Sequence, residues 1–246
     1  MLRGELALTL PNGMLPRSCD RNGSDSCIEW RDKARVYIDY EETDHVHCYH
    51  IHWTSIDQYV YPYDCYELGS AHWYGGVLPI RGPFQNATHA RKPFMTSTVN
   101  APDGLGPVIE PYWLTSRNVA LYVEGNPPLH IEVNQNNDGR FCLVSLYVES
   151  PYANRQPSPW LDYTVCTGPN MRDMHRFMLR RMDTGQRPQP PPLEKFSRVV
   201  YSTWSRFKDN VNQDGVLDYV QNIVDDQLAK GKSTVSSLKV SRRSAR

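Results

Sequence analysis

The segment NVALYVEGNPPLHIEVNQNNDGRFCLVSLYV, residues 118–148, contains three short runs rich in apolar residues, separated by two groups of turn-forming residues. Within each run the side chains follow the two-residue period of a β-strand. Gly125–Pro128 separates the first two runs. Asn136–Gly139 separates the last two and is a strong hairpin signal, because Asn, Asp and Gly tolerate positive φ. The segment therefore predicts antiparallel strands over 118–124, 129–134 and 141–148.

The same period recurs on both sides of this segment. It covers Arg35–Tyr40, Val46–Trp53 and Trp160–Cys166, and no long helical pattern lies between these runs. Many short strands without intervening helices indicate an antiparallel all-β domain. We therefore expect residues 1–170 to form a mainly β domain, and we favour a β-sandwich over a barrel.

The period changes after the last predicted strand. Asn170 is suited to cap a short helix in which Met174, Phe177, Met178 and Met182 share one face. Four prolines then fall within residues 187–192, which is typical of an extended connector rather than of a core. We predict that residues 171–195 are a helix and linker between two domains.

One βα unit is predicted in residues 196–230. Arg198–Trp204 resembles a strand, and Asp214–Lys230 resembles an amphipathic helix. A single strand and helix cannot bury their apolar faces alone, so the unit is interpreted as the opening of a larger parallel fold. Residues 231–246 carry Ser, Lys and Arg and no acidic residue, and we expect a basic, disordered tail.

The charge balance argues against a nucleic-acid-binding protein. The chain has 27 basic and 27 acidic residues, whereas a protein that neutralises nucleic-acid phosphates normally has a basic excess. No apolar run approaches the roughly 18–20 residues of a bilayer-spanning helix. The first ten residues also lack a signal-peptide pattern, so we expect the chain to begin inside a longer protein.

Cysteine usage points to an oxidising compartment. The six cysteines are even in number and lack the close C-x-x-C spacing of metal or redox motifs, so disulfides are favoured, in any of 15 pairings. Two glycosylation sequons begin at Asn22 and Asn86. We predict a secretory-pathway protein, in the endoplasmic reticulum lumen or outside the cell. The alternative is a cytosolic protein with six free thiols.

Four histidines lie close together at residues 45, 47, 50 and 52. Strand alternation places His45 and His47 on one face and His50 and His52 on the other, so at most two converge. Histidines on a half-solvated sheet are therefore favoured over a zinc site. No metal and no cofactor are predicted.

Residues 64–76 are rich in aromatic, polar and glycine residues. Gly75–Gly76 permits close backbone approach, Trp73 offers a flat face that stacks on a sugar ring, and His72, Asp64 and Glu67 suit bonds to hydroxyls. His72 and Trp73 are therefore predicted ligand contacts. Core aromatics beside a tight turn are the equal alternative.

A second pair of candidate contacts follows the predicted strand 198–204. If that strand opens a (β/α)8 barrel, Trp204 and Arg206 lie at its C-terminal end, where such barrels hold their active sites. Trp204 then lines a pocket and Arg206 orients a polar group. The alternative is a strand-end Trp covered by a loop.

Several of these stretches together resemble a known family. The order of sandwich, short helix, Pro-rich connector and the block VVYSTWSRFK, residues 199–208, is similar to the N-terminal part of a family 31 glycoside hydrolase, within it most like the myogenesis-regulating glycosidase group. The blocks DCYE at 64–67, AHWYGG at 71–76, EPYW at 110–113, GPN at 168–170 and VNQ at 211–213 support the resemblance.

The resemblance implies a fold and an activity. It implies a galactose-mutarotase-like sandwich followed by the first βα unit of a truncated barrel, and a retaining α-glycosidase acting on α-glucosides or α-galactosides. In the family, the nucleophile and the acid/base Asp lie on later barrel strands, so no catalytic residue is carried over and we expect the chain alone to be inactive. The pairs Glu41–Glu42 and Asp225–Asp226 are interpreted as solvated side chains. The alternative is a non-catalytic carbohydrate-binding or scaffold protein.

Overall fold

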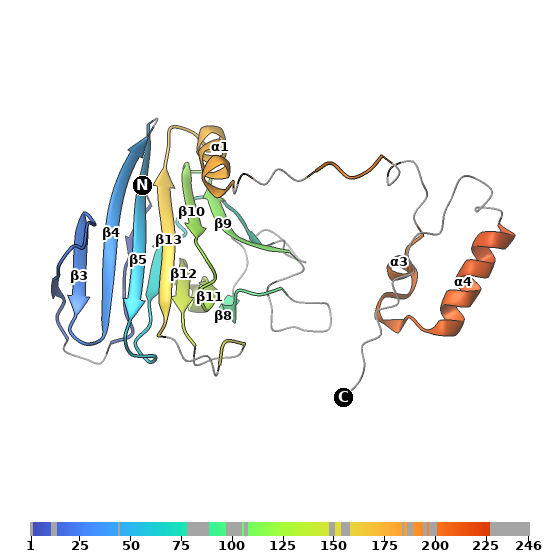
Figure 1. Ribbon diagram of the computed structural model, residues 1–246, viewed down its shortest axis with the longest axis horizontal. Helices are drawn as coiled ribbons and strands as arrows, with labels where there is room; N and C mark the ends of the chain where they lie inside the picture. Colours follow the sequence, from blue (N-terminus) through green and yellow to red (C-terminus); the bar gives the residue numbers. More distant parts are fainter. Residues whose placement is uncertain are drawn as a thin grey trace. The chain divides into compact units, whose positions relative to one another are not determined.

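The computed structural model describes residues 2–10, 14–43, 45–77, 89–96, 105, 108–147, 151–153, 158–183, 185, 189–193, 196 and 201–226. The chain divides into two units, Met1–Asp183 and Thr184–Arg246, which are described separately. Among the described residues, the first unit contains the strands, one α-helix and one 3-10 helix, and the second contains two α-helices and one 3-10 helix (Figure 1).

The first unit is built from two antiparallel sheets. The smaller sheet has the order β1 (Gly4–Glu5), β6 (Tyr63–Glu67), β12 (Arg140–Ser145), β11 (Leu129–Val133) and β8 (His89–Pro93). The larger sheet has the order β2 (Arg17–Ser18), β3 (Ser26–Trp30), β4 (Ala34–Thr43), β5 (Val46–Ser55), β13 (Trp160–Thr167), β10 (Val119–Val123), β9 (Ile109–Thr115) and β7 (Trp73–Val77). The predicted mainly antiparallel β fold is confirmed.

The core lies between the two sheets. Trp53 and Trp113 of the larger sheet and Ile131 and Phe141 of the smaller sheet belong to one cluster of fully buried side chains. The rings of Trp113 and Phe141 meet across the core, with centroids 5.0 Å apart. Burial of these large apolar side chains stabilises the fold by roughly 1.5–3 kcal/mol each.

The hairpin predicted at residues 136–139 joins β11 to β12. A short 3-10 helix, η2 (Gln135–Asn137), forms the turn, and Asn136, Asn137 and Gly139 all have positive φ. Asn134 Oδ1 accepts a hydrogen bond from the Gly139 backbone N–H (2.9 Å). The turn therefore uses the residue types that tolerate this backbone conformation.

Helix α1 (Met171–Met182) packs on the outer face of the larger sheet (Figure 1). As predicted, Asn170 caps it: its side chain accepts from the Asp173 backbone N–H at 2.9 Å. Met174 and Met178 are fully buried against a cluster that includes Val46 and Cys166. The helix therefore covers the part of this face near the start of β5.

All six cysteines are paired. The disulfides are Cys19–Cys27, Cys48–Cys166 and Cys65–Cys142. The second and third each join residues directly opposite each other in neighbouring strands, β5 with β13 and β6 with β12. The prediction of disulfides is confirmed, and the structure selects one of the possible connectivities.

The second unit contains α3 (Thr203–Phe207), the 3-10 helix η3 (Lys208–Asn210) and α4 (Gln213–Asp225). The helix predicted at 214–230 is present up to Asp225, and the Asn212 side chain accepts from the Gly215 N–H (2.8 Å) at its start. Residues 227–246, including the predicted basic tail, lie outside the described residues.

The strand predicted at Arg198–Trp204 is wrong at its C-terminal end. Thr203 and Trp204 lie in helix α3, Tyr201 and Ser202 have no regular structure, and residues 198–200 lie outside the described residues. A β-strand needs a neighbour for its backbone hydrogen bonds, and within the described part of this unit no residues form one. The barrel interpretation is therefore not confirmed.

Within the described residues, no helix combines the length and hydrophobicity that crossing a bilayer requires.

Candidate functional site

The segment Glu67–His72, called the crossover loop below, connects the two sheets at one end of the sandwich. The chain leaves β6 of the smaller sheet at Glu67 and enters β7 of the larger sheet at Trp73. Leu68 is buried, and its N–H bonds to the Gly139 carbonyl (2.9 Å). Gly69 has φ 54°, which allows the chain to turn back immediately.

Hydrogen bonds hold the rest of the crossover loop in place. Arg117 Nη2 donates to Ser70 Oγ (2.7 Å). The His72 N–H donates to Ser116 Oγ (2.9 Å), and the Ser116 N–H returns a bond to the His72 carbonyl (2.8 Å). A loop fixed by these bonds presents its side chains in a defined arrangement, which lowers the entropic cost of binding a ligand.

Two surface hollows flank the crossover loop. The larger has a volume of about 660 Å³ and is lined by the loop together with Asn134, Asp138, Gly139 and Arg140. The smaller, about 190 Å³, lies against Leu2, Arg3, Thr115, Arg117 and Val119. The larger volume falls within the range usual for small-molecule sites.

The lining of the larger hollow includes polar side chains and side chains of both signs of charge. Arg140 Nε lies 3.3 Å from Asp138 Oδ2, and its Nη1 lies 3.6 Å from Glu5 Oε2. Glu67, His72 and Asn134 add further hydrogen-bonding groups. Such a mixture of donors and acceptors suits a ligand with several hydroxyl groups.

Of the two predicted ligand contacts in this segment, His72 is exposed and Trp73 is buried. His72 is exposed and lines the larger hollow. Trp73 is only 1% exposed, its Nε1 lies 3.3 Å from the Leu68 carbonyl, and its ring packs on Phe141. The prediction that Trp73 stacks on a ligand is therefore corrected: strand alternation in β7 turns the indole into the core.

Asp64 is also corrected as a ligand contact, because it is completely buried. Its carboxylate accepts bonds from Trp53 Nε1 (2.7 Å), Tyr163 Oη (2.8 Å) and the Ala7 backbone N–H (2.9 Å). Burial raises the pKa of Asp64 to about 7, and the three bonds act in the opposite direction. Asp64 serves the core of the sandwich and does not reach the crossover loop hollows.

Trp204 and Arg206 belong to the second unit, apart from the unit of His72. Trp204 is 56% exposed on helix α3. The Arg206 guanidinium lies over the rings of Phe207 (5.6 Å) and Tyr219 (5.2 Å), at cation–π distance. Both residues belong to helix α3, and their predicted position at the end of a barrel strand remains a prediction.

Asn22 lies in an exposed turn, the kind of position at which a glycan is attached. It is an exposed turn residue with φ 47°, preceding Gly23 and Ser24. Asn86, the second predicted site, lies outside the described residues. Glycosylation at either position remains a prediction.

The four histidines are divided between a turn and the two faces of the larger sheet. His50 and His52 share the outer face of the larger sheet, as predicted, and His47 points to the other face. His45 precedes β5 and has φ 65°, so it is a turn residue. No cluster of three or more metal-ligating side chains is found among the residues that the structure describes.

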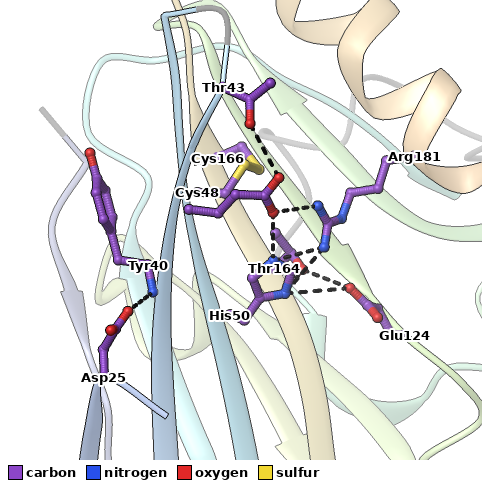
Figure 2. Close-up of polar contacts among 10 residues, drawn as sticks. Asp25, Tyr40, Thr43, Cys48, His50, Glu124, Thr164, Cys166 and Arg181 are labelled. Atoms are coloured by element: carbon purple, nitrogen blue, oxygen red, sulfur yellow. Dashed lines mark hydrogen bonds and ion pairs between the residues drawn. A yellow bond between two sulfur atoms is a disulfide. The ribbon is translucent and has the colours of Figure 1, made fainter. Parts of the chain in front are cut away.

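Instead, His50 belongs to a polar network that fastens α1 to the sheet (Figure 2). Arg181, in the last turn of the helix, donates to Glu41 Oε2 (2.9 Å) and His50 Nε2 (2.7 Å). Thr164 Oγ1 lies 2.9 Å from His50 Nδ1 and donates to Glu124 (2.7 Å). This network was not predictable from the sequence, because its members are far apart in the chain.

Comparison with known proteins adds an independent observation. The chain is 31% identical over 226 residues to the myogenesis-regulating glycosidase of Mus musculus, which covers 84% of this chain and 30% of that protein. It is 30% identical over 168 residues to the SITS-binding protein of Tetronarce californica, covering 66% and 23% of the two chains. No family model matches the chain.

The chain is a relative of the myogenesis-regulating glycosidase. The predicted resemblance to this group of family 31-like proteins is thereby confirmed. The chain spans less than a third of the length of either curated relative.

Solved structures with a similar arrangement include a family 31 sulfoquinovosidase from E. rectale, with a TM-score of 0.46 and 12% identity over 89% of this chain and 34% of that one. A family 31 dextranase from Flavobacterium johnsoniae has a TM-score of 0.37 and 5% identity, over 73% of this chain and 27% of that one.

Proposed function

We propose that this chain forms the sandwich-bearing part of a retaining α-glycosidase that hydrolyses α-glucosides or α-galactosides. The observation that carries the proposal is the 31% identity to a glycosidase along 84% of the chain. In this proposal the sandwich does not perform the chemistry itself. Its crossover loop contacts the sugar, with His72 as a hydrogen-bonding side chain.

The carboxyl groups of the sandwich support a non-catalytic role. A retaining glycosidase needs two carboxyl groups about 5–5.5 Å apart, one of which acts as a general acid and therefore has a raised pKa. Asp64 has a pKa raised to about 7, but its side chain is sealed in the core. Asp138, in the larger hollow, is held by the Arg140 side chain and backbone N–H.

We further propose that the chain resides in the secretory pathway, in the endoplasmic reticulum lumen or outside the cell. Three disulfides among the six cysteines favour an oxidising compartment. Expression in secretory cells followed by removal of N-linked glycans tests this. A mass shift that Asn22→Gln reduces is expected, and a chain with free thiols and no glycan would contradict it.

A non-catalytic carbohydrate-binding protein is the second candidate. The first unit favours this second candidate, because residues 1–183 contain their own core, three disulfides and the larger hollow at the crossover loop. Both candidates require sugar contact at the crossover loop. In the first candidate the bound sugar is the substrate of a hydrolase to which this chain belongs, and in the second the sugar is bound without being hydrolysed.

Sugar binding by the 246-residue chain tests the shared requirement. NMR titrations use α-linked glucose and galactose trisaccharides with the wild-type chain, His72→Ala and the control His45→Asn, which preserves a residue tolerant of positive φ. We expect His72→Ala to weaken binding and His45→Asn to leave it unchanged. Equal binding by all three proteins, or no binding by the wild type, would reject the proposed contact.

A further inference from the structure

The inner face of the larger sheet extends beyond the part that the smaller sheet covers. Along β5, the inward residues Trp53, Ile51 and Tyr49 are 0%, 4% and 47% exposed. On β4, the residue paired with Tyr49 is Tyr40, which is 44% exposed. The same row of side chains thus begins in the core and ends as an exposed aromatic pair.

The rings of Tyr40 and Tyr49 are neighbours, and hydrogen bonds hold the Tyr40 ring in place. Their centroids are 5.3 Å apart. The Tyr40 hydroxyl has one proton, which it donates to Glu42 Oε2 (3.0 Å), so His47 Nδ1 is the donor in its second bond (2.7 Å). The His47 ring also stacks on Tyr40, at 6.1 Å between centroids.

An apolar hollow of about 580 Å³ adjoins this pair. Tyr49 forms part of its wall, together with Leu2, Leu6, Ile51 and Val165. Arg117 and Thr167 add polar groups to the lining. Leu2, Arg117 and Val119 also line the smaller hollow at the crossover loop, so the two hollows are neighbours.

We propose that Tyr40 and Tyr49, with the adjoining hollow, form a second sugar-binding site that takes one pyranose unit of a neutral α-linked oligosaccharide. This deepens the proposed function and rests on it. A pyranose ring has an apolar C–H face and a rim of hydroxyls. Tyrosine offers the matching flat apolar ring with a polar tip, at a small cost in side-chain entropy.

The groups around the rings favour a neutral polyol over an apolar peptide or a charged ligand. Glu42, His47 and the Tyr40 hydroxyl supply both acceptors and donors at the edge of the aromatic surface. Glu42 at this edge is acidic and Arg117 in the adjoining hollow is basic, so the site offers no excess of either charge to an ionic ligand. The hollow beside Tyr49 shares Leu2, Arg117 and Val119 with the smaller hollow at the crossover loop, so the proposed site lies next to that loop.

The test compares variants of the whole 246-residue chain in calorimetric titrations with α-linked glucose and galactose di-, tri- and tetrasaccharides. Tyr49→Ala removes the ring and Tyr49→Phe keeps it. The matched control is Tyr59→Ala, which removes an exposed tyrosine elsewhere on the surface. We expect Tyr49→Ala to weaken binding of the longer sugars at least about fivefold, which corresponds to about 1 kcal/mol. Tyr49→Phe and Tyr59→Ala should bind as the wild type does.

The outcomes separate this inference from the proposed function. If His72→Ala weakens binding and Tyr49→Ala does not, the second site is rejected while the crossover loop contact stands. If no sugar binds the wild type, both are rejected. If Tyr49→Ala instead changes the oligomeric state in sedimentation without changing sugar affinity, the tyrosine pair is a contact between copies of the chain, which also overturns the inference.

Discussion

Arg181 Nη2 lies 2.7 Å from Nε2 of His50, and Nη1 of the same guanidinium donates to Glu41 Oε2 (2.9 Å). An arginine side chain only donates hydrogen bonds, so one group of α1 serves an imidazole of β5 and a carboxylate of β4. Thr164 Oγ1 of β13 lies 2.9 Å from His50 Nδ1. Arg181 thus joins the helix to the sheet through a network that includes three strands (Figure 2).

Removing this contact should loosen the end of α1. Arg181→Ala leaves Glu41 and His50 without their shared donor. Since the side chains are partly exposed, we expect a loss of about 1 kcal/mol in unfolding free energy and faster amide exchange in residues 178–182. The control is the neighbouring exposed Arg180→Ala. Equal exchange in the two variants would show that Arg181 does not hold the helix.

Asp64 predicts the pH dependence of stability. Its folded pKa of about 7 lies above the value of 3.8 for a free Asp side chain, so the folded state binds the proton more tightly. The contribution of Asp64 to stability is therefore complete below about pH 4 and is lost progressively as pH rises through the folded pKa of about 7.

Asp64→Asn tests this slope, because an amide does not titrate. Denaturant unfolding between pH 4 and 8 should show less decline with pH in the variant than in the wild type, whatever its absolute stability. Asp138→Asn, at a surface carboxylate, serves as the control and should keep the wild-type slope. Parallel wild-type and Asp64→Asn curves would show that Asp64 is ionised in the folded protein throughout this range.

His52 titrates with a partner on the neighbouring strand. Its Nδ1 lies 3.4 Å from Asp162 Oδ2, and this carboxylate raises the pKa of His52 above 6.5. The stabilisation is complete below pH 6.5 and is lost as pH rises through the folded pKa. Asp162→Asn should lower the pKa of His52 in an NMR titration, and the control Asp138→Asn should not. An unshifted His52 resonance would disprove the pairing.

The disulfides should differ in their contribution to stability. Cys48–Cys166 closes a sequence separation of 118 residues, and Cys19–Cys27 closes one of 8. Chain-entropy estimates give a loss of about 5 kcal/mol for Cys48→Ala with Cys166→Ala, against about 2–3 kcal/mol for Cys19→Ala with Cys27→Ala. Chemical unfolding measures both. An equal loss would mean that the entropy of the unfolded chain does not determine the effect.

Local patterns carried most of the prediction of the fold. Strands β11 and β5 begin at their predicted residues, Leu129 and Val46, because side-chain alternation and turn residues are written in neighbouring positions. The Asn170 cap and the residues of the 136–139 turn were predictable for the same reason. Alternation also separated His50 and His52 from His47.

Long-range features were not predictable from these patterns. Glu41 and Arg181 are 140 positions apart, and only the packing of α1 on β5 brings them together. Alternation alone gives Trp73 two equivalent faces, and the order of the strands decides which one is buried. The Val-rich pattern near residue 200 predicted a strand, but Trp204 lies in a helix because strand propensity depends on neighbours for pairing.

The decisive experiment is hydrolysis of a panel of chromogenic α- and β-glycosides by the purified 246-residue chain, with a melting curve on the same sample. We expect a first unit that melts cooperatively and no hydrolysis of any glycoside, since Asp64 is sealed in the core and Asp138 is bound by Arg140, so neither is available for a reacting pair. Turnover of an α-glycoside by this chain would show that the sandwich-bearing chain is itself catalytic.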